Sequence, residues 1–288
     1  MDVVARLREL GFERVFVLAG STLGIQEKTL LLTLWPYAAE ERPDGDEAWI
    51  HPYYPASHRA YMAAKTIAQE AAAQGIPLTQ RDDIRLKPIM ARLPGFSQGR
   101  NTLSYVEGLG SRFHVKTFTL DLSLEPTLRV EEQPHGLHCG DCRRCMAACP
   151  NHAIDGDGFH IERCIRYWMM PGKPVPEDIR AAMGNRLIGC DECQRCCPHN
   201  PPAEGAAGDT VPLARLLTEP KTMAEELRTV IGANLTLPNR LLAQGCMIAG
   251  NSGRADLLPQ LESLTEHPSE AVRLHARWAA ENIRKLQD

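Results

Sequence analysis

The sequence predicts a multi-domain protein of mixed α and β structure (α+β). The first 130 residues mix strand-like and helix-like segments, and residues from 211 onward are patterned as helices throughout. All but one of the 10 cysteines lie between positions 139 and 197. From these three observations we expect an α/β domain over residues 1–130, a cysteine-rich domain over 131–204 and a helical domain over 211–288.

The N-terminal part contains three strand-like runs and one long helix-like run. "RVFVLAG" at 14–20 and "TLLLTLWPY" at 29–37 are apolar or β-branched runs of strand length, and "RFHVKTFTLDL" at 112–122 alternates as a half-buried strand does. "SHRAYMAAKTIAQEAAAQG" at 57–75 is rich in alanine and ends on a glycine, which favours a helix with a defined stop. The Pro/Asp/Gly-rich stretch at 40–57 is expected to be a loop.

The C-terminal part consists of helix-sized segments separated by Gly, Asn or Pro, at 223–234, 237–253, 255–267 and 268–286. The last segment places four apolar residues on one face: Val272, Ala276, Ala279 and Ile283. Consecutive helical hairpins of this size resemble a short HEAT-like array. Since two hairpins bury little apolar surface alone, we expect them to pack against the cysteine-rich domain, after a linker at 201–212.

Composition and charge narrow the class of protein. The net charge is −4, and no apolar run approaches the ~18 residues of a membrane-spanning helix. The first 20 residues have the pattern of a short amphipathic helix entering a strand, not that of a signal peptide. We therefore expect a cytoplasmic protein without a membrane partner, in which densely spaced cysteines bind metal and do not form disulfides. A local excess of basic residues lies between Gln80 and Lys116.

The first cysteine motif has the spacing of bacterial ferredoxins. Cys139, Cys142, Cys145 and Cys149-Pro150 form C-x2-C-x2-C-x3-C-P, in which the first three cysteines hold one [4Fe–4S] cluster and the fourth holds a second. A zinc site closes with four tetrahedral ligands, which leaves no use for such a triad followed by Cys-Pro and then repeated. The pattern therefore predicts two [4Fe–4S] clusters.

A second, altered copy of the motif occupies positions 190–198. Exchange of ligands between the two motifs assigns Cys197, which precedes a proline, to the first cluster. Cys149 then joins Cys190 and Cys193 in the second cluster.

The last place in the second cluster has two candidates by spacing. Cys196 completes a C-x2-C-x2-C triad, whereas Cys164 stands alone in "IERCIRYW". Spacing slightly favours Cys196, but a ligand beside Cys197 on a different cluster is sterically crowded, so both stay open. Cys246 lies in the helical segment "RLLAQGCMIAG", where a small buried apolar residue is expected.

The cysteine-rich region resembles the iron-sulfur domain of epoxyqueuosine reductases, which are cobalamin-dependent and related through this module to reductive dehalogenases. The matching residues are Arg163-Cys164, Gly184-Asn185-Arg186, Gly189-Cys190-Asp191, Cys193-Gln194, Cys197-Pro198 and Asn200. The resemblance implies that Cys164 is the eighth ligand and that Cys196 stands where the family has no cysteine. The implied ligand sets are Cys139, Cys142, Cys145 and Cys197 for the first cluster, and Cys149, Cys164, Cys190 and Cys193 for the second.

The likeness extends outward with less specificity. "GRNTL" at 99–103 resembles the family's Gly-Lys-x-Thr-Leu turn near the corrin, so Gly99, Arg100, Asn101 and Thr102 are the implied cobalamin contacts. "NRLLAQGCMIAGNSG" at 239–253 and "HPSEAVRLHARWA" at 267–279 resemble two helices of the family's C-terminal region.

The family's proton donor is an aspartate upstream of the Gly-Lys turn. The simplest superposition places Gln80 at that position, so Asp82 and Asp83 are the nominated proton donors.

The resemblance implies a shortened or divergent cobalamin-dependent reductase that converts epoxyqueuosine to queuosine in tRNA or catalyses a related reductive reaction. It would act as a monomer, with electrons from a donor such as ferredoxin or flavodoxin. The alternative is an iron-sulfur electron-transfer or corrinoid-activating protein that lacks epoxide reductase activity. In a third interpretation the HEAT-like tail is a binding scaffold and the clusters only stabilise it.

Overall fold

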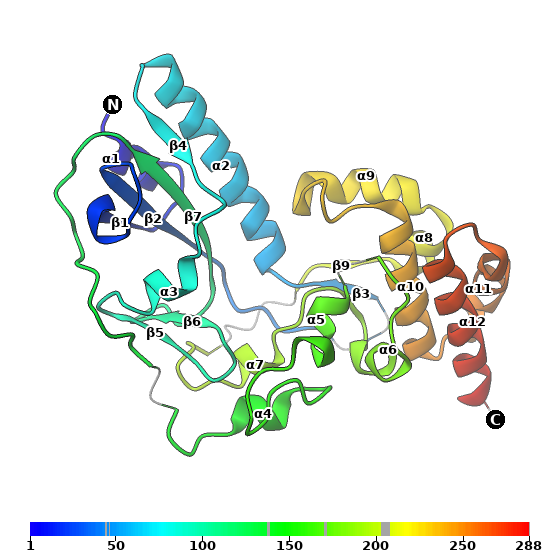
Figure 1. Cartoon of the computed structure of the whole chain (residues 1–288). Helices are drawn as coiled ribbons and strands as arrows, with labels where there is room; N and C mark the ends of the chain where they lie inside the picture. Colours follow the sequence, from blue (N-terminus) through cyan, green and yellow to red (C-terminus); the bar gives the residue numbers. More distant parts are fainter. Residues whose placement is uncertain (44, 46, 137–138, 170–171, 203–207, 288) are drawn as a thin grey trace. The chain divides into compact units, whose positions relative to one another are not determined.

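The computed structural model describes residues 1–43, 45, 47–136, 139–169, 172–202 and 208–287 (Figure 1). By its contacts the chain divides into two compact units. Unit 1 comprises Met1–Ala38, Ala56–Arg143 and Cys197–Pro202, and unit 2 comprises Ala39–Pro55, Arg144–Cys196 and Ala203–Asp288. The chain therefore passes between the units several times, and the three consecutive domains stay a prediction.

Unit 1 is built on a four-stranded antiparallel sheet of order β1-β2-β7-β4. Its strands are β1 (Arg14–Ala19), β2 (Thr29–Pro36), β7 (Phe113–Leu120) and β4 (Leu78–Gln80). The other elements are α1 (Val3–Glu9), η1 (Gly20–Thr22), most of α2 (Tyr53–Ala73), α3 (Leu86–Met90) and a small hairpin of β5 (Phe96–Gln98) and β6 (Ser104–Val106). The three predicted long strands and the predicted long helix are all present.

Both faces of this sheet are covered. On β2, Leu31 packs in a core with residues of α1 and α2, while Leu30 and Leu32 pack in a second core with residues of α3 and β5. The alternation follows from the two-residue period of a strand. Because the sheet is buried on both sides, β2 reads as a continuous apolar run in the sequence.

Unit 2 contains a small sheet of order β8-β3-β9 and nearly all the remaining helices. The strands are β3 (Ala48–Ile50), β8 (Arg186–Ile188) and β9 (Thr210–Val211). The cysteine-bearing segment contributes α4 (Arg144–Ala148), η2 (Ile161–Arg163), α5 (Ile165–Trp168), α6 (Glu177–Met183) and α7 (Glu192–Arg195). The C-terminal part contributes α8 (Leu213–Thr218), α9 (Pro220–Ile231), α10 (Pro238–Ser252), η3 (Ala255–Leu257), α11 (Leu258–Ser263), η4 (Leu264–Glu266) and α12 (Glu270–Lys285).

One continuous core joins the cysteine-bearing segment of unit 2 to the C-terminal helices. Ile179 and Met183 of α6 belong to the same buried cluster as residues of α8, α10 and α12. The expected packing of the helices against the cysteine-rich region is thus confirmed. The predicted buried face of α12 is confirmed as well, and Cys246 of α10 is fully buried.

The loop expected at 40–57 is partly structured. It contains β3, and α2 begins at Tyr53, four positions before the predicted start. Pro55 lies in the first turn of α2, where a proline is tolerated because the first N–H groups of a helix have no partner within the helix. Among the described residues, no helix combines the length and apolar character that crossing a bilayer requires.

Candidate iron-sulfur centres

Four cysteines from separate segments of unit 2 line one cavity. Cys149 follows α4, Cys164 is the N-cap of α5, Cys190 follows β8 and Cys193 lies in α7. The cavity wall between them is mostly apolar, and includes Ile154, Phe159 and Ile165. The four residues are those that the resemblance assigned to the second cluster.

Electrostatics also record how close these thiols lie. Burial raises the pKa of Cys193 well above its ordinary value, and the next causes are its neighbours Cys190, Cys164 and Cys149. Burial raises the pKa of Cys190 to about 11. Without positive charge such thiols stay protonated, and a bound metal supplies that charge, since metal-bound cysteines are thiolates. Within the described residues, no three His, Cys or acidic side chains converge as they would around a single ion.

A tight turn after Cys149 directs a backbone donor at its sulfur. The N–H of His152 donates to the Cys149 carbonyl at 3.2 Å, and His152 adopts a φ of +48°. The N–H of Ala153 then donates to Cys149 Sγ at 3.1 Å. A sulfur that accepts a backbone hydrogen bond has the environment of a thiolate ligand, whose potential such bonds adjust. The donor set therefore fits an iron-sulfur cluster.

Of the two cysteines that competed for the last place, Cys164 lines the cavity. Cys196 is the C-cap of α7, where its N–H donates to the Glu192 carbonyl at 3.2 Å, and it contributes to the raised pKa of Cys193. The ligand sets stay predictions, and the geometry is compatible with the set that the resemblance implies.

The loop that carries Cys190 depends on a glycine. Gly189 has a φ of +94°, and a Cβ placed on it would lie 2.4 Å from His51 Cβ and 2.7 Å from Tyr54 Cε2. Its position next to Cys190 is therefore open to glycine alone. The carboxylate of Asp191, which follows, lies 3.8 Å from His51 Nε2, and burial raises its pKa to about 6.

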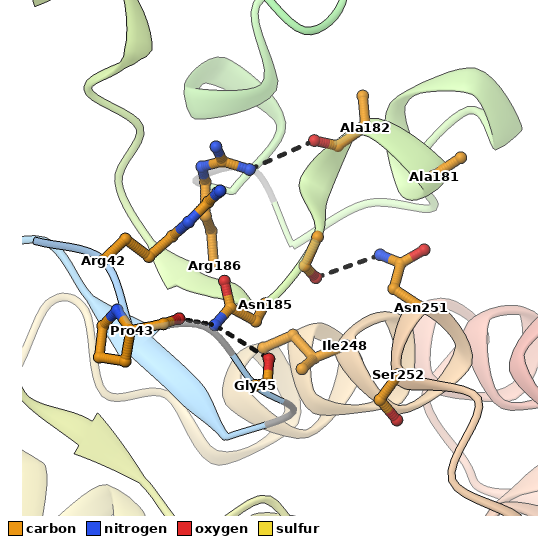
Figure 2. Close-up of a pocket in the computed structure, with 11 residues that line it drawn as sticks. Arg42, Pro43, Gly45, Ala181, Ala182, Asn185, Arg186, Ile248, Asn251 and Ser252 are labelled. Carbon is orange, nitrogen blue, oxygen red and sulfur yellow. Dashed lines mark hydrogen bonds between the residues drawn. The ribbon is translucent and has the colours of Figure 1, made fainter. Parts of the chain in front are cut away.

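A second cavity of unit 2, of about 260 Å³, is lined by several of the residues that carry the resemblance (Figure 2). Asn185 donates to the carbonyls of Pro43 and Gly45, at 3.1 and 3.3 Å. Asn251 donates to the carbonyls of Arg180 and Gly184, at 2.8 and 3.1 Å. The two amides therefore fix neighbouring backbone segments.

On one side of this cavity, two arginines share a single carboxylate. Arg186 pairs with Glu192, which lies between Cys190 and Cys193 in the sequence, and Arg42 lies 3.5 Å from the same carboxylate. These contacts hold the loop that supplies two of the predicted ligands.

The predicted ligands of the first cluster are divided between the units. Cys139, Cys142 and Cys197 belong to unit 1, and Cys145 lies in α4 of unit 2. The N–H of Cys142 donates to the Cys139 carbonyl at 2.8 Å, in a turn that Gly140 permits with a φ of +46°. This ligand set stays a prediction.

The segment Cys197–Pro202 is fastened to the rest of unit 1 by Asn200. Its Oδ1 accepts the N–H and the Oγ–H of Ser111, at 2.7 and 3.0 Å. A Cβ on Gly110 would lie 2.3 Å from that oxygen, so the contact requires a glycine there. The matching "CP-x-N" of the sequence thus contains an anchor as well as a ligand, a role that sequence alone did not reveal.

The predicted cobalamin turn is ordered by its own backbone. The N–H of Thr102 donates to the Gly99 carbonyl at 2.9 Å, and Thr102 adopts a φ of +61°. Arg100 is exposed, and its Nη2 donates to the Gly140 carbonyl at 3.1 Å. Asn101 is buried, and its amide donates to the Tyr105 hydroxyl at 3.0 Å. A ligand at this turn would therefore meet Arg100 and backbone atoms before it met the Asn101 side chain.

The two nominated proton donors lie in different electrostatic settings. Asp83 accepts two hydrogen bonds from the Arg81 guanidinium, each of 2.8 Å, and these lower its pKa to about 2. Asp82 accepts one hydrogen bond of 2.8 Å from Gln80 and lies 3.3 Å from Lys116 Nζ. A general acid needs a raised pKa, so Asp83 is poorly suited in this conformation.

The basic excess between Gln80 and Lys116 is largely engaged within the protein. Arg81 pairs with Glu27 and Asp83, Lys116 pairs with Asp82, and Arg112 is buried and donates to the Pro201 carbonyl. These residues are structural before they are available to a nucleic acid.

The four thiols and the repeated Cys-Pro motif define a double-cluster iron-sulfur protein. Residues 138–200 match the family model described as a 4Fe-4S double cluster binding domain. The chain is 30% identical to epoxyqueuosine reductase of Xanthomonas campestris over 274 residues, which cover 83% of this chain and 74% of that protein. It is 33% identical to the Pseudomonas aeruginosa enzyme of the same name over 193 residues, which cover 63% of this chain and 52% of that protein.

Solved structures share the fold. An epoxyqueuosine reductase with an epoxyqueuosine-modified tRNA-Tyr stem loop matches with a TM-score of 0.75 at 18% identity, covering 98% of this chain and 89% of that one. The Streptococcus thermophilus epoxyqueuosine reductase also gives a TM-score of 0.75, at 19% identity, covering 99% of this chain and 90% of that one. The chain belongs to the epoxyqueuosine reductase family.

Proposed function

We propose that this protein reduces epoxyqueuosine to queuosine in tRNA, with two [4Fe–4S] clusters and cobalamin as cofactors. The observation that carries the proposal is the similarity to the Xanthomonas enzyme over most of both chains. It is supported by the four cysteines around one cavity, which are chemically suited to an iron-sulfur cluster. The reaction removes the epoxide oxygen as water and consumes two electrons and two protons.

The cysteines have the role of holding the electron-carrying centres. We assign Cys139, Cys142, Cys145 and Cys197 to the first cluster, and Cys149, Cys164, Cys190 and Cys193 to the second. Each cysteine that precedes a proline then serves the cluster of the other motif, as in two-cluster ferredoxins. Clusters of this kind pass single electrons.

Cobalamin would supply a cobalt centre that accepts these electrons and acts on the epoxide. In this chain, we assign its contacts to the turn formed by Gly99, Arg100, Asn101 and Thr102. The exposed Arg100 side chain and the backbone of the turn would orient it, while Asn101 supports the turn from inside through Tyr105.

A carboxyl group must deliver a proton to the leaving oxygen. We favour Asp82 over Asp83, because Asp83 is held as a carboxylate by the bidentate contact with Arg81. Asp82 has a single neutral donor, Gln80, and one ammonium at 3.3 Å, that of Lys116.

The partners that we propose are a tRNA substrate and a small electron donor such as ferredoxin or flavodoxin. We also propose that the protein acts as a cytoplasmic monomer. The C-terminal helices would form a HEAT-like array, in which paired helices bury apolar faces against neighbouring pairs.

The test is an anaerobic reconstitution in three steps. Iron analysis should give about eight irons per chain, as expected for two four-iron clusters. Addition of cobalamin should produce the absorption spectrum of a bound, base-off corrin. With a reductant, the loaded protein should convert epoxyqueuosine in tRNA to queuosine, detected by mass spectrometry as the loss of one oxygen atom. Iron binding without corrin binding would refute the reductase assignment.

The position of Gln80 favours one alternative. An amide there cannot donate the proton that the family's aspartate provides, and an electron-transfer or corrinoid-activating protein would need no such acid. Full cluster loading, with electron transfer to an added corrinoid protein and no turnover of epoxyqueuosine, would be the signature of that alternative.

A further inference from the structure

Tyr105 of β6 lies beside a predicted cluster ligand without belonging to any cysteine motif. Its side chain is 2% exposed, and its ring lies 6.3 Å from that of His199, edge to face. Its hydroxyl forms hydrogen bonds with the side chains of Cys197, Asn101 and Ser111. A buried phenol thus touches the sulfur of the cysteine before Pro198.

The hydrogen-bond directions indicate where the phenolic proton points. The Asn101 amide can only donate, and it donates to the Tyr105 oxygen at 3.0 Å. The Ser111 hydroxyl donates to Asn200 Oδ1 at 3.0 Å. The Tyr105 O–H is then free to donate to Cys197 Sγ. Burial and the contact with Cys197 raise the pKa of Tyr105, so the phenol keeps its proton at neutral pH.

The contact is held in place from the Cys197 side as well. Asn200 is bound to the N–H of Ser111 at 2.7 Å, and the absent side chain of Gly110 leaves room for this approach. A segment fixed three residues after Cys197 leaves the sulfur little freedom to move away from Tyr105.

We propose that Tyr105 is a positioning residue that donates a hydrogen bond to Cys197 Sγ and thereby raises the reduction potential of the cluster that Cys197 holds. The inference rests on the proposed function, because it takes Cys197 as a ligand of the first cluster. A hydrogen bond to a thiolate withdraws negative charge from the sulfur. It therefore stabilises the reduced cluster, which carries one more negative charge, more than the oxidised cluster.

The test is Tyr105→Phe in the reconstituted full chain, which keeps the ring and removes only the hydroxyl. Each cluster is followed by EPR during an anaerobic redox titration. At a fixed applied potential, we expect the ratio of reduced to oxidised first cluster to fall about tenfold, which corresponds to a shift of about −59 mV for one electron. The second cluster should titrate unchanged, and iron content should stay at about eight per chain.

Two further variants make the result specific. Tyr61→Phe removes the same hydroxyl from a tyrosine of α2 that is 49% exposed, and neither cluster should shift. Asn101→Ala keeps Tyr105 but removes the donor that polarises its hydroxyl, so a smaller shift of the same sign is expected. This variant tests the inference even if Tyr105→Phe fails to fold.

Three outcomes would overturn the inference while leaving the proposed function intact. They are two fully loaded clusters with no shift, a shift to higher potential, or an equal shift of both clusters. Wild-type protein that binds only about four irons would instead refute the two-cluster assignment itself.

Discussion

Gly189 offers a direct test of how the loop that carries Cys190 is built. An alanine at position 189 would place its Cβ 2.4 Å from His51 Cβ and 2.7 Å from Tyr54 Cε2, at a φ of +94°. The left-handed backbone costs about 1–2 kcal/mol for an alanine, and forcing a methyl group into a packed site costs about 1–3 kcal/mol. We therefore expect Gly189→Ala to lower the free energy of unfolding by about 2–5 kcal/mol.

The measurement is urea unfolding of iron-free protein under anaerobic conditions, followed by circular dichroism. Gly156→Ala is the matched control, because its added Cβ has no atom within 4 Å and its φ lies outside the left-handed region. That variant should stay within about 0.5 kcal/mol of the parent. In reconstituted protein, Gly189→Ala should also lose iron, to about four per chain, because the second cluster depends on this loop. Equal stability and iron content in the two variants would show that the crowding at Gly189 is not real.

Three other changes test the ligands, the acid and a buried histidine. Cys164→Ser should lower iron to about four per chain whereas Cys196→Ser leaves about eight, and the reverse would contradict the ligand assignment. Asp82→Asn should lower kcat by a factor of about 10²–10⁴ in the tRNA assay while Asp83→Asn has little effect; equal losses would remove the distinction between them. Burial lowers the pKa of His275 to about 4, below its unfolded value near 6.5, so its contribution is complete above pH 6.5 and is lost as the pH falls toward 4. Urea unfolding should show a decline of about 3 kcal/mol over that interval, and His275→Gln should flatten it; an unchanged slope would mean that other groups titrate.

The elements that the sequence predicted are those whose burial follows a single period. β2 and α12 could be read directly, because one sheet or one helical face is buried along the whole element. β3 could not, since three residues are too few to show a period, and its strand partners lie far along the chain. The start of α2 was missed because Pro55 looks like a helix boundary in sequence, although the first turn of a helix accepts it.

The candidate site divides in the same way. Ferredoxin spacing predicted two clusters, because neighbouring ligands of a cluster are close in sequence. Spacing could not decide between Cys164 and Cys196, since that depends on how η2 and α7 meet in space. Tyr105 was missed altogether, because its contact with Cys197 spans a long stretch of chain and a lone tyrosine carries no motif.

The shared core of unit 2 has a consequence for the C-terminal helices. α6 and β8 bury their apolar side chains among those of α8, α10 and α12, so the segments that bear the cysteines have no separate interior. A chain truncated before α10 would leave Leu187 and Ile188 facing water, and the loops between them and the thiols would lose their support. Melting of the tail and release of iron should therefore be one cooperative event, and a destabilising lesion in α12 should behave like a defect in metallation.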